Sequence, residues 1–183
     1  MMIKKMKTSM AFAKNLFVTG AFKETSRNAE VEICKYIPKG DHKVIVELGM
    51  GHGNITREIL NIISPTSKVY AYEIKKSFCD YVRNTIVDDR LIIVNDGAEN
   101  IYKHIEEDID SVIGSIPFSF FSKEKSNEII QGSYNKLVNN AYYSQVLYTK
   151  FNFKKFEQIF NSCFMKKIKS MPTEYVYHCR KAV

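Results

Sequence analysis

The segment from Val44 to Asn54 constrains the fold of this chain more than any other part of the sequence. A short apolar run of β-branched residues, closed by Glu47 and Leu48, predicts a buried strand. Three glycines follow at alternating positions, and a helical pattern then runs from Ile55 to Ile63. Glycine adopts positive φ readily and lets a ligand approach the backbone, and a following helix points free N–H groups at that ligand. The segment therefore predicts a strand, turn and helix built around a ligand. A turn that binds nothing is the weaker alternative.

Strand and helix patterns alternate along the rest of the chain. We predict strands at residues 68–73, 90–95, 109–114 and 141–149, and helices at 75–86, 98–105, 122–138 and 153–161. Such alternation is typical of a mostly parallel α/β sheet covered by helices on both faces. Two final strands, at 164–169 and 174–180, have no helix between them and should form an antiparallel hairpin at one edge. We expect a single domain over residues 1–183, with N-terminal helices in 1–40 and the core in 41–183.

The spacing of the glycines distinguishes two kinds of nucleotide site. In the dinucleotide fingerprint G-x-G-x-x-G the third glycine comes one residue later than Gly53 does here, and no acid is required where Glu47 stands. The sequence Glu47-Leu48-Gly49-Met50-Gly51-His52-Gly53 resembles motif I of class I S-adenosylmethionine (SAM)-dependent methyltransferases. The resemblance implies a Rossmann-like, seven-stranded fold and SAM as the cofactor, with its amino-acid part above the glycine turn.

Two acids at later strand ends match further motifs of that family. Glu73 stands where the family's acid accepts hydrogen bonds from the ribose hydroxyls, and Asp96 stands where its acid meets the adenine amine. Each of them could instead cap a helix. The resemblance implies SAM contacts from residues at several strand ends and in the segment before the first strand: Ser26, Glu47, Gly49, Gly51, Gly53, Asn54, Glu73, Ile74, Asp96, Gly97, Ala98 and Ser115.

The segment Ser115-Ile116-Pro117-Phe118 stands where these enzymes hold the methyl acceptor. Adenine-N6 and ribosomal RNA adenine methyltransferases have Asn or Asp at the first of these positions, and serine is too short to copy the amide. The segment is more similar to that of bacterial phospholipid N-methyltransferases. Thr19-Gly20-Ala21 and Thr25-Ser26 resemble another segment of that family, although Glu24 replaces its proline, and the pattern of the C-terminal strands is similar too.

This second resemblance implies that the acceptor is the amine of phosphatidylethanolamine or of a partly methylated derivative. Methyl transfer needs alignment of donor and acceptor and exclusion of water rather than a nucleophilic side chain. We expect Ser115 to hold the amine. We expect aromatic rings to face the cation that methylation creates, since such rings attract cations: Phe118, Phe120, Phe121 and Tyr148. The alternative is that the aromatic residues from Phe118 to Phe121 belong to the hydrophobic core.

Positive charge gathers at both ends of the chain. Residues 1–23 carry five lysines and no acid, and residues 146–183 carry eight basic residues and two glutamates. We expect an anionic partner, and a membrane surface rather than a nucleic acid, although solubility alone could explain the lysines. Residues 1–18 predict a basic helix with bulky apolar residues. Such a helix either lies in a membrane interface or forms a lid over the site.

Composition excludes several other classes of protein. We see no apolar segment long enough to span a bilayer, no secretory signal, no C-x-x-C pair and no metal-ligand cluster. We expect a cytoplasmic, peripherally membrane-associated monomer without a metal. Three other functions stay open: a ribosomal RNA adenine methyltransferase, a small-molecule N- or O-methyltransferase, and a SAM-binding protein without catalysis.

Overall fold

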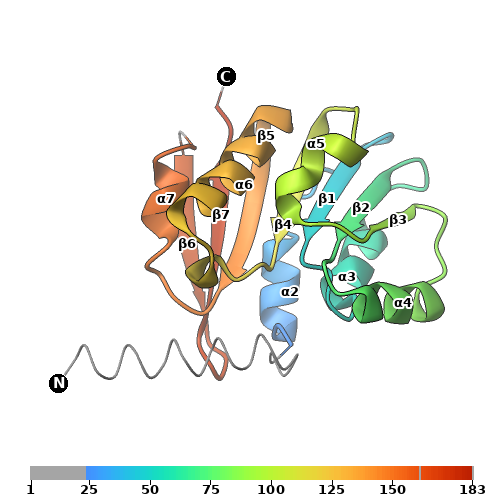
Figure 1. The fold of residues 1–183 in the computed structure, drawn as a ribbon, viewed down its shortest axis with the longest axis horizontal. Coiled ribbons are helices and arrows are strands. Elements are labelled where there is room, and N and C mark those ends of the chain that lie inside the picture. The colour runs from blue at the N-terminus through green and yellow to red at the C-terminus, as the bar shows by residue number, and fades with distance from the viewer. Residues whose placement is uncertain (1–23, 161, 183) are drawn as a thin grey trace.

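A twisted seven-stranded sheet forms the centre of the molecule (Figure 1). The computed structural model describes residues 24–160 and 162–182. The strand order is β3-β2-β1-β4-β5-β7-β6. The strands are β1 (Val44–Leu48), β2 (Lys68–Tyr72), β3 (Leu91–Val94), β4 (Ile109–Gly114), β5 (Leu137–Leu147), β6 (Ser162–Ile168) and β7 (Glu174–Arg180). Strands β1 to β5 pair in parallel, and β7 pairs antiparallel with both β5 and β6. The predicted fold class is confirmed.

Helices cover both faces of the sheet. The apolar residues of α2 (Arg27–Ile33) and α3 (Asn54–Ile62) are buried with Ile45 and Val69 on one face, and α4 (Lys76–Thr85) packs against Ala71 on that face. On the opposite face, α5 (Ile101–His104), α6 (Lys123–Lys136) and α7 (Phe153–Glu157) cover Val46, Val112 and Tyr143. Because β1 is buried on both faces, its residues are apolar without alternation except at Glu47.

Most predicted elements form within a few residues of their expected bounds, with three differences. Helix α6 ends at Lys136 and β5 begins at the next residue, four positions before the predicted strand. The predicted helix at 98–105 is a 3₁₀ turn, η1 (Ala98–Asn100), followed by the single turn of α5. Helix α7 is five residues long, shorter than predicted. The hairpin forms the sheet edge as expected, with β7 inside and β6 outside.

The predicted helix at residues 1–18 lies outside the described residues. Within the described part of the chain, no helix combines the length and the apolar character needed to cross a bilayer.

Candidate cofactor and acceptor site

The glycine turn after β1 has the backbone conformation that its sequence predicts. Gly49, Gly51 and Gly53 have φ angles of +85°, +54° and +81°. The N–H groups of Gly49 and Met50 donate to the carbonyl of Tyr72 at 2.9 and 3.0 Å, which fixes the turn beside the end of β2. A Cβ on Gly53 would lie 2.8 Å from Ile86, whereas one on Gly51 would meet no atom within 4 Å. Gly51 therefore exposes its backbone to open space, where a ligand can approach it.

Glu47 lies beneath this turn in the interior, and it is not among the residues that line the cavity above the turn. Its Oε2 accepts a hydrogen bond of 2.6 Å from the Thr56 hydroxyl of α3, and its Oε1 has no partner. Burial, reinforced by the charge of Glu73 and opposed by the Thr56 bond, raises the pKa of Glu47 to about 8. Glu47 is therefore largely uncharged at neutral pH.

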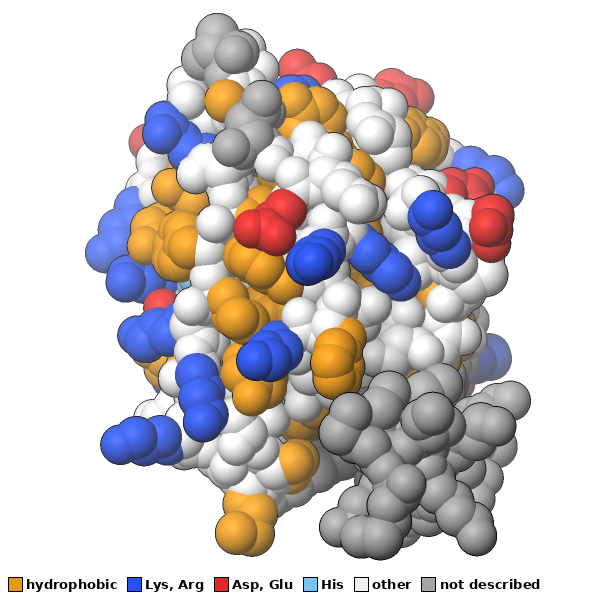
Figure 2. Space-filling view, turned by 90° about the vertical axis from the view of Figure 1, so that its left-hand side faces the viewer, with side chains coloured by type: hydrophobic (Ala, Val, Ile, Leu, Met, Phe, Trp, Pro, Cys, Tyr) orange, Lys and Arg blue, Asp and Glu red, His pale blue; other side chains and the backbone are white. Residues whose placement is uncertain are grey.

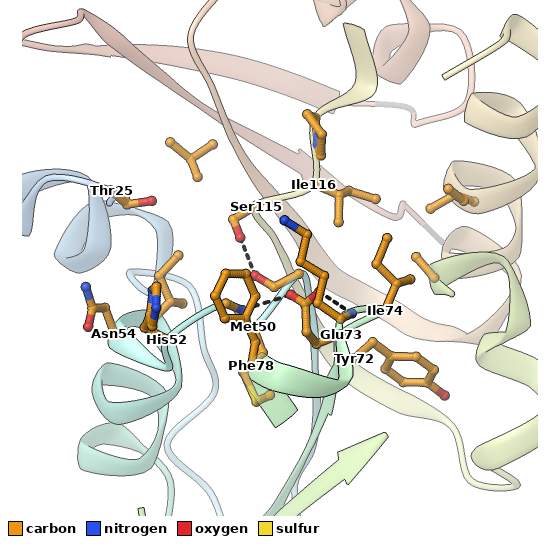
Figure 3. Close-up of a pocket in the computed structure, with 18 of the residues that line it drawn as sticks. Thr25, Met50, His52, Asn54, Tyr72, Glu73, Ile74, Phe78, Ser115 and Ile116 are labelled. Carbon is orange, nitrogen blue, oxygen red and sulfur yellow. Dashed lines mark hydrogen bonds between the residues drawn. The ribbon is translucent and has the colours of Figure 1, made fainter. Parts of the chain in front are cut away.

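Glu73 connects the end of β2 to the glycine turn (Figure 3). Its two carboxylate oxygens accept hydrogen bonds from the N–H groups of Gly51, at 3.1 Å, and Lys75, at 2.9 Å. The side-chain amide of Asn95 donates to the Glu73 carbonyl at 2.8 Å. The carboxylate is thus held at the cavity wall, and each oxygen keeps a lone pair for a ligand hydroxyl.

Asp96, after β3, is the second acid at the cavity. Its pKa is lowered to about 2 by hydrogen bonds, first from His104 and then from Asn100 and the Gly97 N–H. The three heavy-atom distances are 2.8, 2.8 and 2.7 Å. Asp96 is therefore ionised and fixed in orientation. It can accept a hydrogen bond from an exocyclic amine without first losing a proton.

A cavity of about 220 Å³ opens above the carboxyl ends of strands β1 to β5. Nine residues of the predicted site line it: Gly49, Gly51, Asn54, Glu73, Ile74, Asp96, Ala98, Ser115 and Tyr148. Five do not line it: Ser26, Glu47, Gly53, Gly97 and Phe118. The sheet thus brings most of the predicted site together, at the edge where open α/β sheets bind ligands.

Ser26 has a structural contact instead of a place in this cavity. Its N–H donates to Glu174 at 3.0 Å and its hydroxyl donates to the other oxygen of the same carboxylate. These bonds join the start of α2 to the start of β7. The preceding residues, Glu24 and Thr25, line the cavity in its place.

The segment after β4 forms the wall nearest the expected acceptor. Ser115 donates its hydroxyl hydrogen to the Gly49 carbonyl at 2.6 Å, as Figure 3 shows. The buried amide of Gln145 donates to the carbonyls of Ile116 and Val146, at 3.0 Å each. A Cβ on Gly114 would lie 2.1 Å from Gln145 Oε1, so this close contact requires glycine. Gln145 therefore fixes the backbone of the segment, a role that we did not predict.

Phe118 belongs to the hydrophobic core. It is fully buried, and its ring packs edge-on against Phe121 and Phe156, with ring centroids 5.8 and 5.3 Å apart. The alternative interpretation of the aromatic cluster thus fits Phe118, while Phe121 is the ring of this cluster that lines the cavity. Tyr148 also lines the cavity, and burial, with the charge of Glu174, raises its pKa to about 12.

Several lining residues were not assigned to the site from the sequence. His52 packs against the ring of Phe78 at 4.5 Å, and both side chains point to the cavity (Figure 3). On another wall, Lys125 forms an ion pair of 2.8 Å with Glu99. In the sequence, Phe78 and Lys125 fit ordinary helix patterns, and His52 is a variable position between two glycines of the turn.

The residues of the cavity fit SAM. The exposed backbone at Gly51 suits the amino-acid part of SAM. The lone pairs of the Glu73 carboxylate suit the ribose hydroxyls, and the ionised Asp96 suits the adenine amine. The apolar side chains of Ile74 and Phe78 supply surface for a ring. Among the described residues, no cluster of three or more potential metal ligands is present.

Known proteins share this architecture. No protein-family model matches the chain. An ornithine lipid N-methyltransferase of Singulisphaera acidiphila is 23% identical over 158 residues, which cover 79% of each protein. The precorrin-6y C5,15-methyltransferase of Geobacter metallireducens superposes with a TM-score of 0.73 at 15% identity, covering 87% of this chain and 90% of that one. A Streptococcus mutans protein solved in complex with SAH superposes with a TM-score of 0.66 at 15% identity, covering 87% and 99%.

These matches confirm the predicted resemblance: the chain has the fold of class I SAM-dependent methyltransferases. They also support the prediction of SAM as the cofactor.

Proposed function

We propose that the chain is a SAM-dependent methyltransferase that methylates the amine of a lipid headgroup. The observation that carries the cofactor assignment is the convergence of Gly51, Glu73 and Asp96 on one cavity. The lipid amine is supported by the relative named as an ornithine lipid N-methyltransferase and by serine, rather than Asn or Asp, at position 115. Phosphatidylethanolamine and its methylated derivatives are the acceptors that we favour.

In this proposal SAM supplies the electrophilic methyl group. Among the lining residues, Gly49 and Gly51 would hold its amino-acid part, Glu73 would accept hydrogen bonds from its ribose hydroxyls, and Asp96 and Ala98 would hold its adenine. The acceptor would have to release its ammonium proton to solvent before its nitrogen lone pair could bond to the methyl group, and the positive charge of the sulfonium would then appear on the methylated nitrogen. The protein contributes alignment of the two reactants and exclusion of water.

Ser115 and Tyr148 are the polar side chains that we assign to the acceptor. Because the Ser115 hydroxyl donates its hydrogen to Gly49, its oxygen can accept a hydrogen bond from the amine and orient the nitrogen lone pair. Tyr148, with a pKa of about 12, keeps its proton at neutral pH and so orients the acceptor rather than serving as a base. Of the aromatic rings expected to face the cation, we keep Phe121 and Tyr148, which line the cavity, and drop Phe118, which does not.

The test is methyl transfer from methyl-labelled SAM to vesicles that contain phosphatidylethanolamine, with ornithine-lipid vesicles as a second substrate. We expect label in the extracted lipid, and chromatography of the product gives the number of methyl groups. Asp96→Asn should weaken SAM binding, while Asp89→Asn, a change to an exposed acid in the loop before β3 and outside the cavity, serves as the matched control. Label that enters only RNA or a soluble amine would contradict the lipid proposal.

We further propose that residues 1–18 bind the membrane as a basic amphipathic helix. Deleting them should abolish co-sedimentation with anionic vesicles while leaving SAM binding intact. A truncated protein that sediments with vesicles as the full chain does would refute this.

A further inference from the structure

A second cavity of about 230 Å³ adjoins the cofactor cavity. It lies between the turn that joins β6 to β7 and the residues before α2, and Tyr148 and Glu24 line both cavities. A molecule held in the second cavity therefore lies beside the expected acceptor position. Neither the SAM motifs nor the proposed mechanism so far uses this space.

The walls of the second cavity carry opposite charges. Two acids line it: Glu174, which is almost completely buried with both oxygens bound by Ser26, and Glu24, whose carboxylate lies 3.7 Å from Nδ1 of His52. Lys169 stands on the β6–β7 turn, is exposed, and makes no ion pair or hydrogen bond with the described residues. The buried acid Glu174 and the exposed lysine Lys169 complement a zwitterion whose ammonium group lies deeper in the cavity than its anionic group.

The surface around this cavity suits a lipid. Met171 on the β6–β7 turn and Phe151 after β5 are 84% and 74% exposed. Because β5 and β6 both run antiparallel to β7, these two residues lie at the same edge of the sheet. Exposed lysines occur in the segment after β5, in α7, on β6 and on the β6–β7 turn: Lys150, Lys154, Lys166, which pairs with Glu32, Lys167 and Lys169. Figure 2 shows hydrophobic side chains interspersed with Lys and Arg over this side of the molecule. Apolar tips among lysines are the pattern that anionic membrane surfaces attract.

We propose that the second cavity is the headgroup subsite for a zwitterionic membrane lipid, with Lys169 binding its anionic group while Glu174 and Glu24 attract its ammonium past Tyr148 into the cofactor cavity. This inference rests on the proposed function and names how the acceptor is recognised. The anionic group is a phosphate in an ethanolamine phospholipid and a carboxylate in an ornithine lipid, and both would contact the same lysine.

The test is direct binding of soluble headgroups to the full chain in the presence of SAH, measured by calorimetry. Glycerophosphoethanolamine carries the phosphate and Nα-acetylornithine the carboxylate, so the tighter ligand identifies the natural anion. Lys169→Glu should weaken binding about tenfold, the loss expected for one charge-assisted contact. Lys167→Glu is the matched control, because it changes the same charge on the same hairpin outside the cavity.

Equal loss in the two variants would show general electrostatic attraction and overturn the proposal, as would a wild-type protein that binds neither headgroup. The proposal would be supported if Lys169→Arg still binds the headgroup while Lys169→Glu loses binding. Methyl transfer separates the two claims. A wild-type protein that binds headgroups through Lys169 but transfers no methyl group to lipid would refute the proposed reaction and leave the subsite in place.

Discussion

Replacing Glu47 with glutamine should change how the stability of the protein depends on pH. In the folded protein the pKa of Glu47 is raised from 4.5 to about 8, mainly by burial. Between these two values the unfolded chain loses the Glu47 proton while the folded chain retains it. Ionisation then stabilises the unfolded state, so the free energy of unfolding falls as pH rises. Below pH 4.5 and above pH 8 the contribution is constant.

The expected magnitude follows from the size of the shift. Each pH unit within the window costs about 1.4 kcal/mol, and the whole window costs at most about 5 kcal/mol. Glutamine has the same shape, can still accept the Thr56 hydrogen bond and does not ionise. The wild type should therefore lose stability relative to Glu47→Gln from pH 5 to pH 8.

Urea unfolding at pH 5, 6, 7 and 8 measures this difference directly. At pH 5 the two proteins should lie within about 1 kcal/mol of each other, apart from any cost of the added amide N–H. By pH 8 the variant should be the more stable by several kcal/mol. Parallel curves of unfolding free energy against pH would refute the reasoning, since they would mean that Glu47 ionises alike in both states.

Three further predictions concern the turn, the acceptor segment and the core. Gly51→Ala should lower SAM affinity about tenfold but cost only ~1–2 kcal/mol of stability, because its Cβ enters the open space where the ligand would lie. Gly53→Ala should cost more stability, because its Cβ would clash with Ile86. Calorimetry measures the change in SAM affinity, and urea unfolding measures the change in stability. Gln145→Leu frees the Ile116 carbonyl and should lower kcat more than it changes the Kd of SAM, and an unchanged kcat would contradict a positioning role. Phe118→Ala should destabilise the protein by ~3–5 kcal/mol in urea unfolding, and a loss of activity at full stability would instead place Phe118 in the site.

Much of the fold was predictable because its signals are local. The β-branched run before Glu47 and the glycines after it define a strand and a turn within a dozen residues. The ends of parallel strands meet at one edge, so Glu73 and Asp96 could be assigned to the same cavity as Gly51 from sequence order alone. The antiparallel hairpin of β6 and β7 was predictable because no helix pattern separates the last two strands.

The remaining features depend on contacts between distant parts of the chain. Ser26 lies 148 positions from Glu174, and no local pattern indicates that this carboxylate occupies the serine hydroxyl. Gln145 reaches Ile116 across 29 positions. Phe118 follows a motif proline, which suggested a place at the acceptor, but packing of its ring against Phe156 decides its position. Burial of a particular side chain is a property of the assembled sheet rather than of its neighbours in sequence.

The position of β7 between β5 and β6 has a consequence for the order of folding. Among the described strands, β6 pairs with β7 alone, and β5 has β7 as its second neighbour. A chain made from its N-terminus therefore exposes an open edge at β5 and an unpaired β6 until Glu174 to Arg180 have been synthesised. Because β7 also carries the carboxylate that binds Ser26, closure of the sheet and anchoring of α2 occur together. We expect the cofactor cavity to form late and cooperatively, so that incomplete chains have little affinity for SAM.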